Sequence, residues 1–316
     1  MDRSIPGIHH VTAIAGDPQR NLDFYAGVLG LRLVKLTVNF DDPETYHLYY
    51  GDGQGTPGTI LTFFPWPDAP RGRPGAGQVA VTSFSVPLDA ADYWAERLRS
   101  HEILFEEHAR FGARILSLAD PDGLRLELVA AADPREGWTA GRIPADYAVR
   151  GIYGVTLAEA RADRTTPLLI TIMGFRQTAE EGNRLRFETG AGGPGAVVEI
   201  ESLEGRAPGR VAVGSVHHVA WRTPDDAGQA AWRDEIDRSG LHVTPIIDRK
   251  YFHSIYFREP GGVLFEIATD PPGFAVDEPR EELGTHLLLP PWLEPRRGEL
   301  ERVLPPLRLP ALTQGA

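Results

Sequence analysis

The sequence of 316 residues contains no cysteine, and this absence excludes disulfides, thiolate metal sites and cysteine nucleophiles. No apolar run approaches the roughly 20 residues that a membrane-spanning helix needs. The opening, MDRSIPGIHH, lacks the apolar core of a secretory signal. Lysine and arginine form no block, and the net charge of −12 argues against a nucleic-acid partner. These absences predict a cytoplasmic protein without membrane or nucleic-acid partners, in which His, Asp and Glu hold any metal.

The most unusual feature that is present is a pair of adjacent histidines in an apolar, strand-like context, and it occurs twice. The first pair lies in IHHVT, residues 8–12, and the second in VHHVAW, residues 216–221. Each pair opens a segment with the same order of expected elements, which is a strand, a helix and three further strands. Such repetition indicates a chain assembled from equivalent structural units.

Two further copies of this order begin at VAVTSFSVP and at GIYGVTL. Linkers rich in proline and glycine, such as PDAPRGRPGAG, separate the copies. The sequence therefore predicts four βαβββ units, at residues 7–65, 78–132, 150–203 and 214–271. We group them into an N-terminal pair in residues 1–140 and a C-terminal pair in residues 141–275, followed by a tail in residues 276–316.

The helices of the first and fourth units are predicted from their start signals. Asp17 is placed to cap a helix that has Pro18 at its first position. Thr223 followed by proline predicts a similar start in the fourth unit, with three apolar residues facing inward, namely Ala227, Ala231 and Ile236. One unit alone leaves a curved sheet with an unburied apolar face, so two units must pack together. We predict an α+β fold of four βαβββ modules paired into two cup-like barrels.

Equivalent positions in the four units differ in their chemistry. Only the first and fourth units carry histidine on the first strand, at His10 and His218. The equivalent position on the last strand holds Thr62 in the first unit and a glutamate in the other three, at Glu127, Glu199 and Glu266. Only the fourth unit therefore combines histidine with glutamate, and we interpret Glu127 and Glu199 as structural polar groups.

This pattern resembles the vicinal oxygen chelate superfamily, which includes glyoxalase I, fosfomycin-resistance proteins and extradiol dioxygenases, over essentially the whole chain. In that superfamily the first and last strands of paired modules aim side chains at one metal. The resemblance implies His10, His218 and Glu266 as ligands, with Thr62 as a poor fourth ligand. Two histidines and one carboxylate with open positions are typical of non-haem Fe(II) oxygenases. Mn(II) accepts the same ligands and remains an alternative. If these units supply the ligands, the first and fourth share one cup.

Two longer stretches resemble the ring-cleaving dioxygenases of the hydroquinone type. They are DRKYFHSIYFREPGGVLFEIATDPPGF, residues 248–274, and LLLPPWLEPRRGELERVLPPL, residues 287–307. The resemblance implies an enzyme that uses dioxygen to cleave a small aromatic diol. It also assigns substrate-binding or ligand-supporting roles to five residues, namely His9, Thr12, His217, Arg249 and Tyr256. Aromatic side chains are expected to line the pocket, with Phe252 and Phe257 as candidates on opposite strand faces.

Several alternatives remain open at this stage. Strand alternation predicts that only one histidine of each pair faces the cup, and the resemblance selects His10 and His218. Arg249 has the alternative of an ordinary salt bridge, and His47 and most other single histidines are expected at the surface or in loops. His253 is an exception that could line the pocket. A catechol-type extradiol dioxygenase, a glyoxalase-like isomerase or transferase, and a non-catalytic binding protein are the alternative functions. A homodimer is a reasonable expectation for paired sheets.

Overall fold

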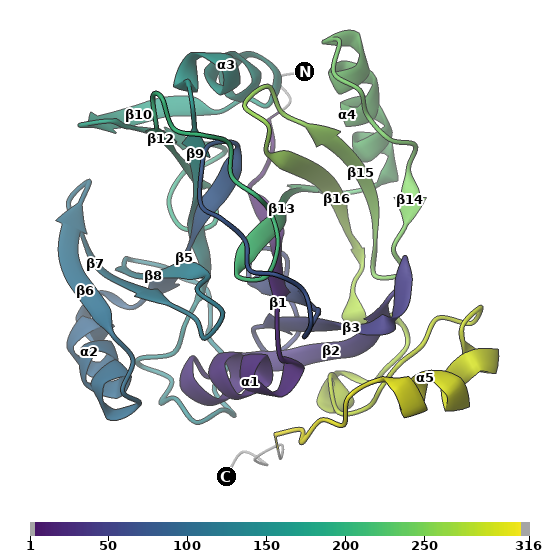
Figure 1. Ribbon diagram of the computed structural model, residues 1–316. Helices are drawn as coiled ribbons and strands as arrows, with labels where there is room; N and C mark the ends of the chain where they lie inside the picture. Colours follow the sequence, from purple (N-terminus) through teal and green to yellow (C-terminus); the bar gives the residue numbers. More distant parts are fainter. Residues whose placement is uncertain (1–3, 311–316) are drawn as a thin grey trace.

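The computed structural model describes residues 4–310, which form two curled eight-stranded sheets with few helices (Figure 1). The first sheet has the strand order β14-β15-β16-β13-β1-β4-β3-β2, and the second has the order β10-β11-β12-β9-β5-β8-β7-β6. The predicted α+β fold with two cups is confirmed. Among the described residues, no helix has both the length and the apolar character that crossing a membrane requires.

Each sheet is made of two repeat units. The first sheet joins the first unit to the fourth. The strands of the first unit are β1 (Ile8–Ala15), β2 (Arg32–Asn39), β3 (Asp42–Gly51) and β4 (Ile60–Pro65). Those of the fourth unit are β13 (Ser215–Thr223), β14 (Ile247–Asp248), β15 (Phe252–Arg258) and β16 (Leu264–Pro272).

The second sheet joins the second unit to the third. The strands of the second unit are β5 (Gln78–Val86), β6 (Phe105–Arg110), β7 (Ala113–Ala119) and β8 (Arg125–Ala130). Those of the third unit are β9 (Gly151–Glu159), β10 (Arg176–Glu181), β11 (Arg184–Glu188) and β12 (Val197–Ser202).

The chain order and the sheet order therefore differ. Residues 1–140 and residues 141–275 each contribute one unit to each sheet. The division into these two halves remains a proposal about sequence order, and residues 311–316 of the predicted tail lie outside the described residues. In both sheets the first strands of the two units pair antiparallel at the centre, as β1 with β13 and as β5 with β9.

The helices lie outside the sheets, at α1 (Pro18–Leu22), α2 (Ala91–Ser100), α3 (Ala162–Pro167), α4 (Asp226–Arg238) and α5 (Arg297–Val303). The predicted cap is confirmed at α1, where the Asp17 carboxylate accepts a hydrogen bond from the Arg20 N–H at 2.7 Å. The helix α1 continues as a π-helix, residues 23–28, before the turn at Gly30.

The predicted start of α4 was displaced by two residues. Asp225, rather than Thr223, caps this helix by accepting a hydrogen bond from the Gly228 N–H at 2.7 Å. Two of the three residues predicted to face inward are not buried, since Ala227 is exposed and Ala231 is half-buried. Ile236 is buried as predicted, together with Gln229 and Trp232.

The tail packs against the first sheet and completes its core, with α5 beside β3 (Figure 1). Lys35 on β2 is fully buried, and its Nζ atom lies 2.8 Å from Asp277 Oδ1 and 2.7 Å from Glu278 Oε2. An uncompensated buried ammonium group is strongly unfavourable, so the tail residues are needed by the sheet that they cover.

The strands at the centre of each sheet contain matching β-bulges. In the first sheet Ile8 pairs with Trp221 and His10 with Ala220, which leaves His9 as an extra residue. On the opposite strand His217 is the extra residue between the partners of Thr12 and Ala13. A bulge bends the strand and changes the direction of its side chains, so simple alternation does not hold at either histidine pair.

Candidate metal centre

The three predicted ligands converge at the centre of the first sheet. His10 comes from β1, His218 from β13 and Glu266 from β16, and these strands are neighbours. All three side chains are buried, and one candidate ligand atom from each lies within 4.8 Å of the other two. Glu266 Oε2 is 2.8 Å from His218 Nε2 and 3.3 Å from His10 Nε2.

The two oxygens of Glu266 have different environments. Oε1 accepts a hydrogen bond from Ser254 Oγ at 2.5 Å. Oε2 is buried and makes no hydrogen bond among the described residues, although two imidazole Nε2 atoms face it. Burial alone would raise the pKa of Glu266, but His10 and His218 hold this pKa well below its usual value. A buried carboxylate oxygen beside two imidazole nitrogens is a donor set that fits a divalent cation.

Each candidate ligand histidine contacts the histidine that precedes it in the sequence. His9 Nδ1 lies 2.9 Å from His10 Nδ1, and His217 Nδ1 lies 2.7 Å from His218 Nδ1. When the Nε2 atoms of His10 and His218 bind a metal, their Nδ1 atoms carry the proton and donate it to these neighbours. Such a contact fixes the tautomer and the orientation of a ligand.

Three of these histidines, His9, His217 and His218, are neutral at physiological pH, the state that metal ligation or support of a ligand requires. Burial lowers the pKa of His218 and of His9, and the lowering at His9 is large. Burial, with a smaller contribution from His218, lowers the pKa of His217 to about 3.

A cavity of about 420 Å³ opens beside the three converging side chains. Four of the five residues predicted to support the site line it, namely Thr12, His217, Arg249 and Tyr256, whereas His9 is buried and does not line it. The Arg249 Nε–H donates to Tyr256 Oη at 3.3 Å, and Arg249 Nη1 lies 2.9 Å from Asp41 Oδ2. Arg249 therefore makes a salt bridge and also faces the cavity.

The cavity wall shows which other candidates reach the site. Phe252 lines the cavity, and Phe257 lies in the hydrophobic core on the opposite strand face. His253 does not line it and contacts Asp226 at 2.6 Å instead. The rest of the wall combines four apolar side chains with several polar ones. The apolar side chains are Phe40, Phe64, Trp66 and Leu264, and the polar ones include Asn39, Asp41 and Asp42.

Sequence reasoning missed His47, which was expected at the surface or in a loop and instead lines the cavity from β3. Its Nε2 atom lies 2.9 Å from Thr62 Oγ1, and its Nδ1 atom lies 2.8 Å from the Tyr49 hydroxyl. Thr62 in turn donates to Thr12 at 2.9 Å. The fourth ligand position thus holds a hydroxyl engaged in hydrogen bonds. His47 and Tyr49 alternate along a strand that precedes the last strand of the first unit, so they share one strand face. This spacing could have identified His47 as a residue that faces Thr62.

The second sheet has the same bulges but a different centre. Ala80 and Tyr153 are its extra residues, so Val81 and Gly154 occupy the positions equivalent to His10 and His218. Glu127 and Glu199 lie at the ligand-equivalent positions of the last strands, and the Arg110 guanidinium binds both, at 2.7 Å and 2.8 Å. An arginine side chain thus supplies the positive charge between these carboxylates.

Comparisons with known proteins agree with this architecture. The Glyoxalase/Bleomycin resistance protein/Dioxygenase superfamily matches residues 7–128 and 155–267. A Bacillus subtilis protein named "Putative ring-cleaving dioxygenase MhqO" is 48% identical over 310 residues, which cover 98% of this chain and 99% of that protein. The chlorohydroquinone/hydroquinone 1,2-dioxygenase of Sphingobium indicum is 35% identical over 315 residues, with 96% and 97% of the two chains covered.

Solved structures give the same result for the fold. The crystal structure of a dioxygenase from Bacillus subtilis, described as putative, matches with a TM-score of 0.94 and 48% identity, over 98% of this chain and 99% of that chain. Glyoxalase I from Zea mays matches with a TM-score of 0.64 and 15% identity, over 84% of this chain and 92% of that chain. At this low identity the likeness to glyoxalase I concerns the fold alone.

Proposed function

Because the chain belongs to the Glyoxalase/Bleomycin resistance protein/Dioxygenase superfamily, we propose that it is an Fe(II)-dependent dioxygenase that cleaves the ring of a hydroquinone. Its similarity to ring-cleaving dioxygenases extends over nearly the whole chain. The observation that carries the proposal is the buried group of His10, His218 and Glu266 beside an aromatic-lined cavity, with Thr62 where a fourth ligand would stand.

In this proposal His10, His218 and Glu266 hold the metal. Two histidines and one carboxylate that leave positions open are the ligand set of non-haem Fe(II) oxygenases. Mn(II) takes the same donor types and is the alternative metal. The bound metal supplies the electron-transfer chemistry that lets dioxygen react with an electron-rich ring. The protein supplies the orientation of the ring and a site shielded from water.

The residues around the cavity orient the substrate oxygens. His217 accepts the His218 Nδ1 proton in the metal-binding tautomer, so its own proton lies on Nε2 and is available to a substrate oxygen. This arrangement makes His217 a hydrogen-bond donor toward the substrate. Burial, followed by the charge of Glu266, raises the pKa of Tyr256. Tyr256 therefore stays protonated and can donate, while Arg249 favours an anionic substrate oxygen.

The assignment of a hydroquinone as the substrate is more specific than the assignment of ring cleavage as the reaction. It is supported by one named relative and by the residues of the cavity wall. The Sphingobium indicum relative is named for hydroquinone substrates, and at 35% identity it extends over almost all of this chain. Aromatic side chains in the cavity wall, including Phe252 and Trp66, can pack against an aromatic ring. The homodimer and the cytoplasmic location remain predictions from the sequence.

The experiment that tests the proposal measures oxygen uptake by protein loaded with Fe(II) under anaerobic conditions. The substrates are 2-methylhydroquinone, catechol and a hemithioacetal, and bound iron is quantified in the same samples. We expect stoichiometric uptake with the hydroquinone, together with loss of bound iron and of activity in His218→Ala and Glu266→Gln. His253→Ala is the matched control, because this histidine lies outside the cavity, and it retains both.

Each other outcome points to a named alternative. Uptake with catechol alone would keep the iron site and reject the para-diol substrate. Turnover of the hemithioacetal without oxygen uptake would replace the dioxygenase by an isomerase. An aromatic ligand that binds the metal-free protein, with no turnover of any substrate, would indicate a binding protein.

A further inference from the structure

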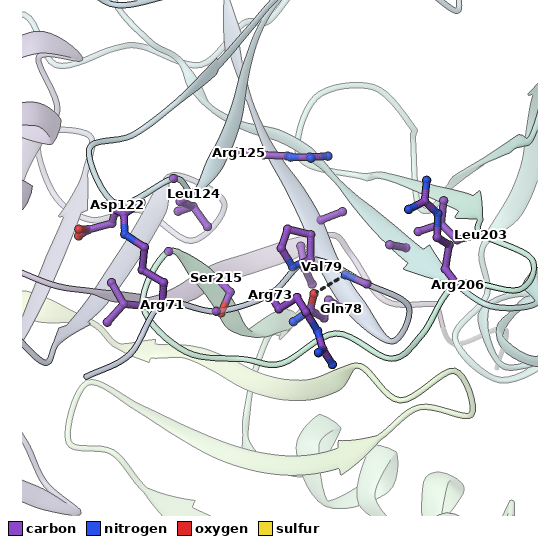
Figure 2. Close-up of a pocket in the computed structure, with 18 of the residues that line it drawn as sticks. Arg71, Arg73, Gln78, Val79, Asp122, Leu124, Arg125, Leu203, Arg206 and Ser215 are labelled. Atoms are coloured by element: carbon purple, nitrogen blue, oxygen red, sulfur yellow. Dashed lines mark hydrogen bonds between the residues drawn. The ribbon is translucent and has the colours of Figure 1, made fainter. Parts of the chain in front are cut away.

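A second cavity, of about 440 Å³, lies away from the candidate metal centre, where the two sheets meet. Two inter-unit linkers form much of its wall, one with Arg71 and Arg73 and the other with Leu203 and Arg206. The turn between β7 and β8, residues 120–124, and the start of β13 complete the wall (Figure 2). We refer to this cavity as the linker cleft. Its volume lies in the range of small-molecule sites.

Four arginines surround the linker cleft, and their charge is not compensated locally. Arg71, Arg73, Arg125 and Arg206 are exposed, and within residues 4–310 none of them forms a salt bridge. The two acidic residues in the wall form salt bridges with arginines outside this set. Asp122 is paired with Arg20, and Glu201 with Arg184 at 3.1 Å. This concentration of positive charge is unusual in a chain with a net charge of −12.

A buried amide in the same wall provides an independent indication of a ligand. Gln78 is only 7% exposed, and its Oε1 atom accepts a hydrogen bond from the Gly75 N–H at 3.1 Å (Figure 2). Its Nε2 atom is buried and has no hydrogen-bond partner among the described residues. An unpaired buried donor costs free energy, and an anionic oxygen is the partner that suits it best.

The wall is held in shape by the protein itself. The two linkers exchange backbone hydrogen bonds, since the Arg73 N–H donates to Arg210 O and the Arg210 N–H donates to Arg73 O, both at 2.9 Å. Gly75 packs so closely on Gly209 that a Cβ atom at Gly75 would lie 2.5 Å from the Gly209 nitrogen. The linkers are therefore arranged before any ligand arrives, which reduces the entropic cost of binding.

We propose that the linker cleft binds a small, multiply charged anion through these arginines and the Gln78 amide. Four uncompensated guanidinium groups favour a ligand with several negative charges, and the cavity is larger than one inorganic ion needs. Phosphate and carboxylate groups share the required chemistry, because both accept paired hydrogen bonds from arginine. A nucleic acid is disfavoured by the strongly acidic chain as a whole.

The test is isothermal titration calorimetry of the whole protein with pyrophosphate and, separately, with citrate, at about 150 mM NaCl to screen non-specific attraction. We expect saturable binding of at least one of the two anions with a stoichiometry of one. The anion that binds more tightly shows whether the cleft prefers phosphate or carboxylate groups. In Arg125→Gln/Arg206→Gln the affinity falls by about tenfold or more, since each lost charge-assisted hydrogen bond contributes to it.

The matched control is Arg164→Gln/Arg280→Gln, which removes the same charge from exposed arginines outside the linker cleft. It should bind as the wild type does. Gln78→Glu gives a second variant, because it keeps an acceptor for the Gly75 N–H and replaces the free donor by a repelling carboxylate. Its binding should be lost while its melting temperature shows that it is folded.

Two results would overturn the proposal. One is the absence of saturable binding for both anions. The other is an equal loss of affinity in the cleft variant and in the control, which would show attraction by overall charge. Neither result depends on Fe(II) or on ring cleavage, so this test stands apart from that of the proposed activity.

Discussion

His9 and His217 explain why the chain repeats a histidine pair. Each is the extra residue of a β-bulge, and each places its Nδ1 atom against the Nδ1 atom of the ligand that follows it. A regular strand would send the two side chains to opposite faces, where they could not meet. In the proposed metal site, each pair thus provides a ligand together with the group that orients it, on each of two strands.

His9 separates this supporting role from substrate binding, because it does not line the cavity. We predict that His9→Leu weakens metal binding by about 10- to 100-fold, since the His10 Nδ1–H loses its acceptor. His9→Asn offers an amide oxygen in place of the Nδ1 atom and should recover most of the affinity. The measurement is competition between the protein and a chelator for Co(II), followed by absorbance.

The substrate KM of metal-saturated His9→Leu should remain close to that of the wild type. His253→Leu, at a histidine outside the site, is the control and should leave the metal affinity unchanged. If the leucine and asparagine variants at position 9 lose affinity equally, His9 contributes packing rather than orientation.

At the scale of elements, the strand β9 ends at a buried carboxyl that contacts the other sheet. Glu159 is fully buried against the turn between β15 and β16, where a Cβ atom on Gly261 would lie 1.8 Å from Glu159 Oε2. Its neighbour Glu259 accepts hydrogen bonds from Thr165 Oγ1 at 2.5 Å and from the Val263 N–H at 2.7 Å. Burial, and then the charge of Glu259, raises the pKa of Glu159 to about 8.

This pKa makes stability depend on pH in a defined direction. Between the unfolded value near 4.5 and the folded value of about 8, the folded protein holds a proton that the unfolded chain has released. The contribution to stability is complete below this window and is lost as the pH rises through it. The side chain in Glu159→Gln stays neutral at every pH. The melting temperature of this variant minus that of the wild type should therefore increase between about pH 6 and about pH 9.

Both proteins are compared without metal, and the exposed variant Glu281→Gln serves as the control. A gain of about 1–2 °C in the melting temperature corresponds to about 1 kcal/mol in a chain of this size. A constant difference between Glu159→Gln and wild type across the pH range would contradict the assignment of the titrating group to Glu159.

The helices and strands show which features the sequence could predict and which it could not. Repeat spacing and start signals such as Asp17 predicted the units, because these features are local. The register of β1 against β13 is not local, and so the bulges that bring His217 beside His218 were missed. At α4 two candidate caps lie close together, and Asp225 rather than Thr223 makes the hydrogen bond. His47 was missed because its role depends on the neighbouring strand with Thr62.

At the scale of the whole molecule, each sheet takes one unit from each half of the chain, and the candidate metal centre is divided in the same way. His10 lies in residues 1–140, whereas His218 and Glu266 lie in residues 141–316. Neither half can complete a sheet alone, because β1 would lack β13 and β5 would lack β9. Each half would therefore expose an apolar central strand as an edge.

We predict that residues 1–140 and 141–316, produced separately, fail to bind metal tightly, and that the two halves produced together assemble and bind one ion. Metal content, the circular dichroism of the assembled pair and its elution volume are the measurements. A pair that carries His10→Ala should still assemble but lose the metal, which separates folding from ligation. Tight metal binding by residues 141–316 alone would show that His10 is not a ligand. All ligands would then have to come from the C-terminal half.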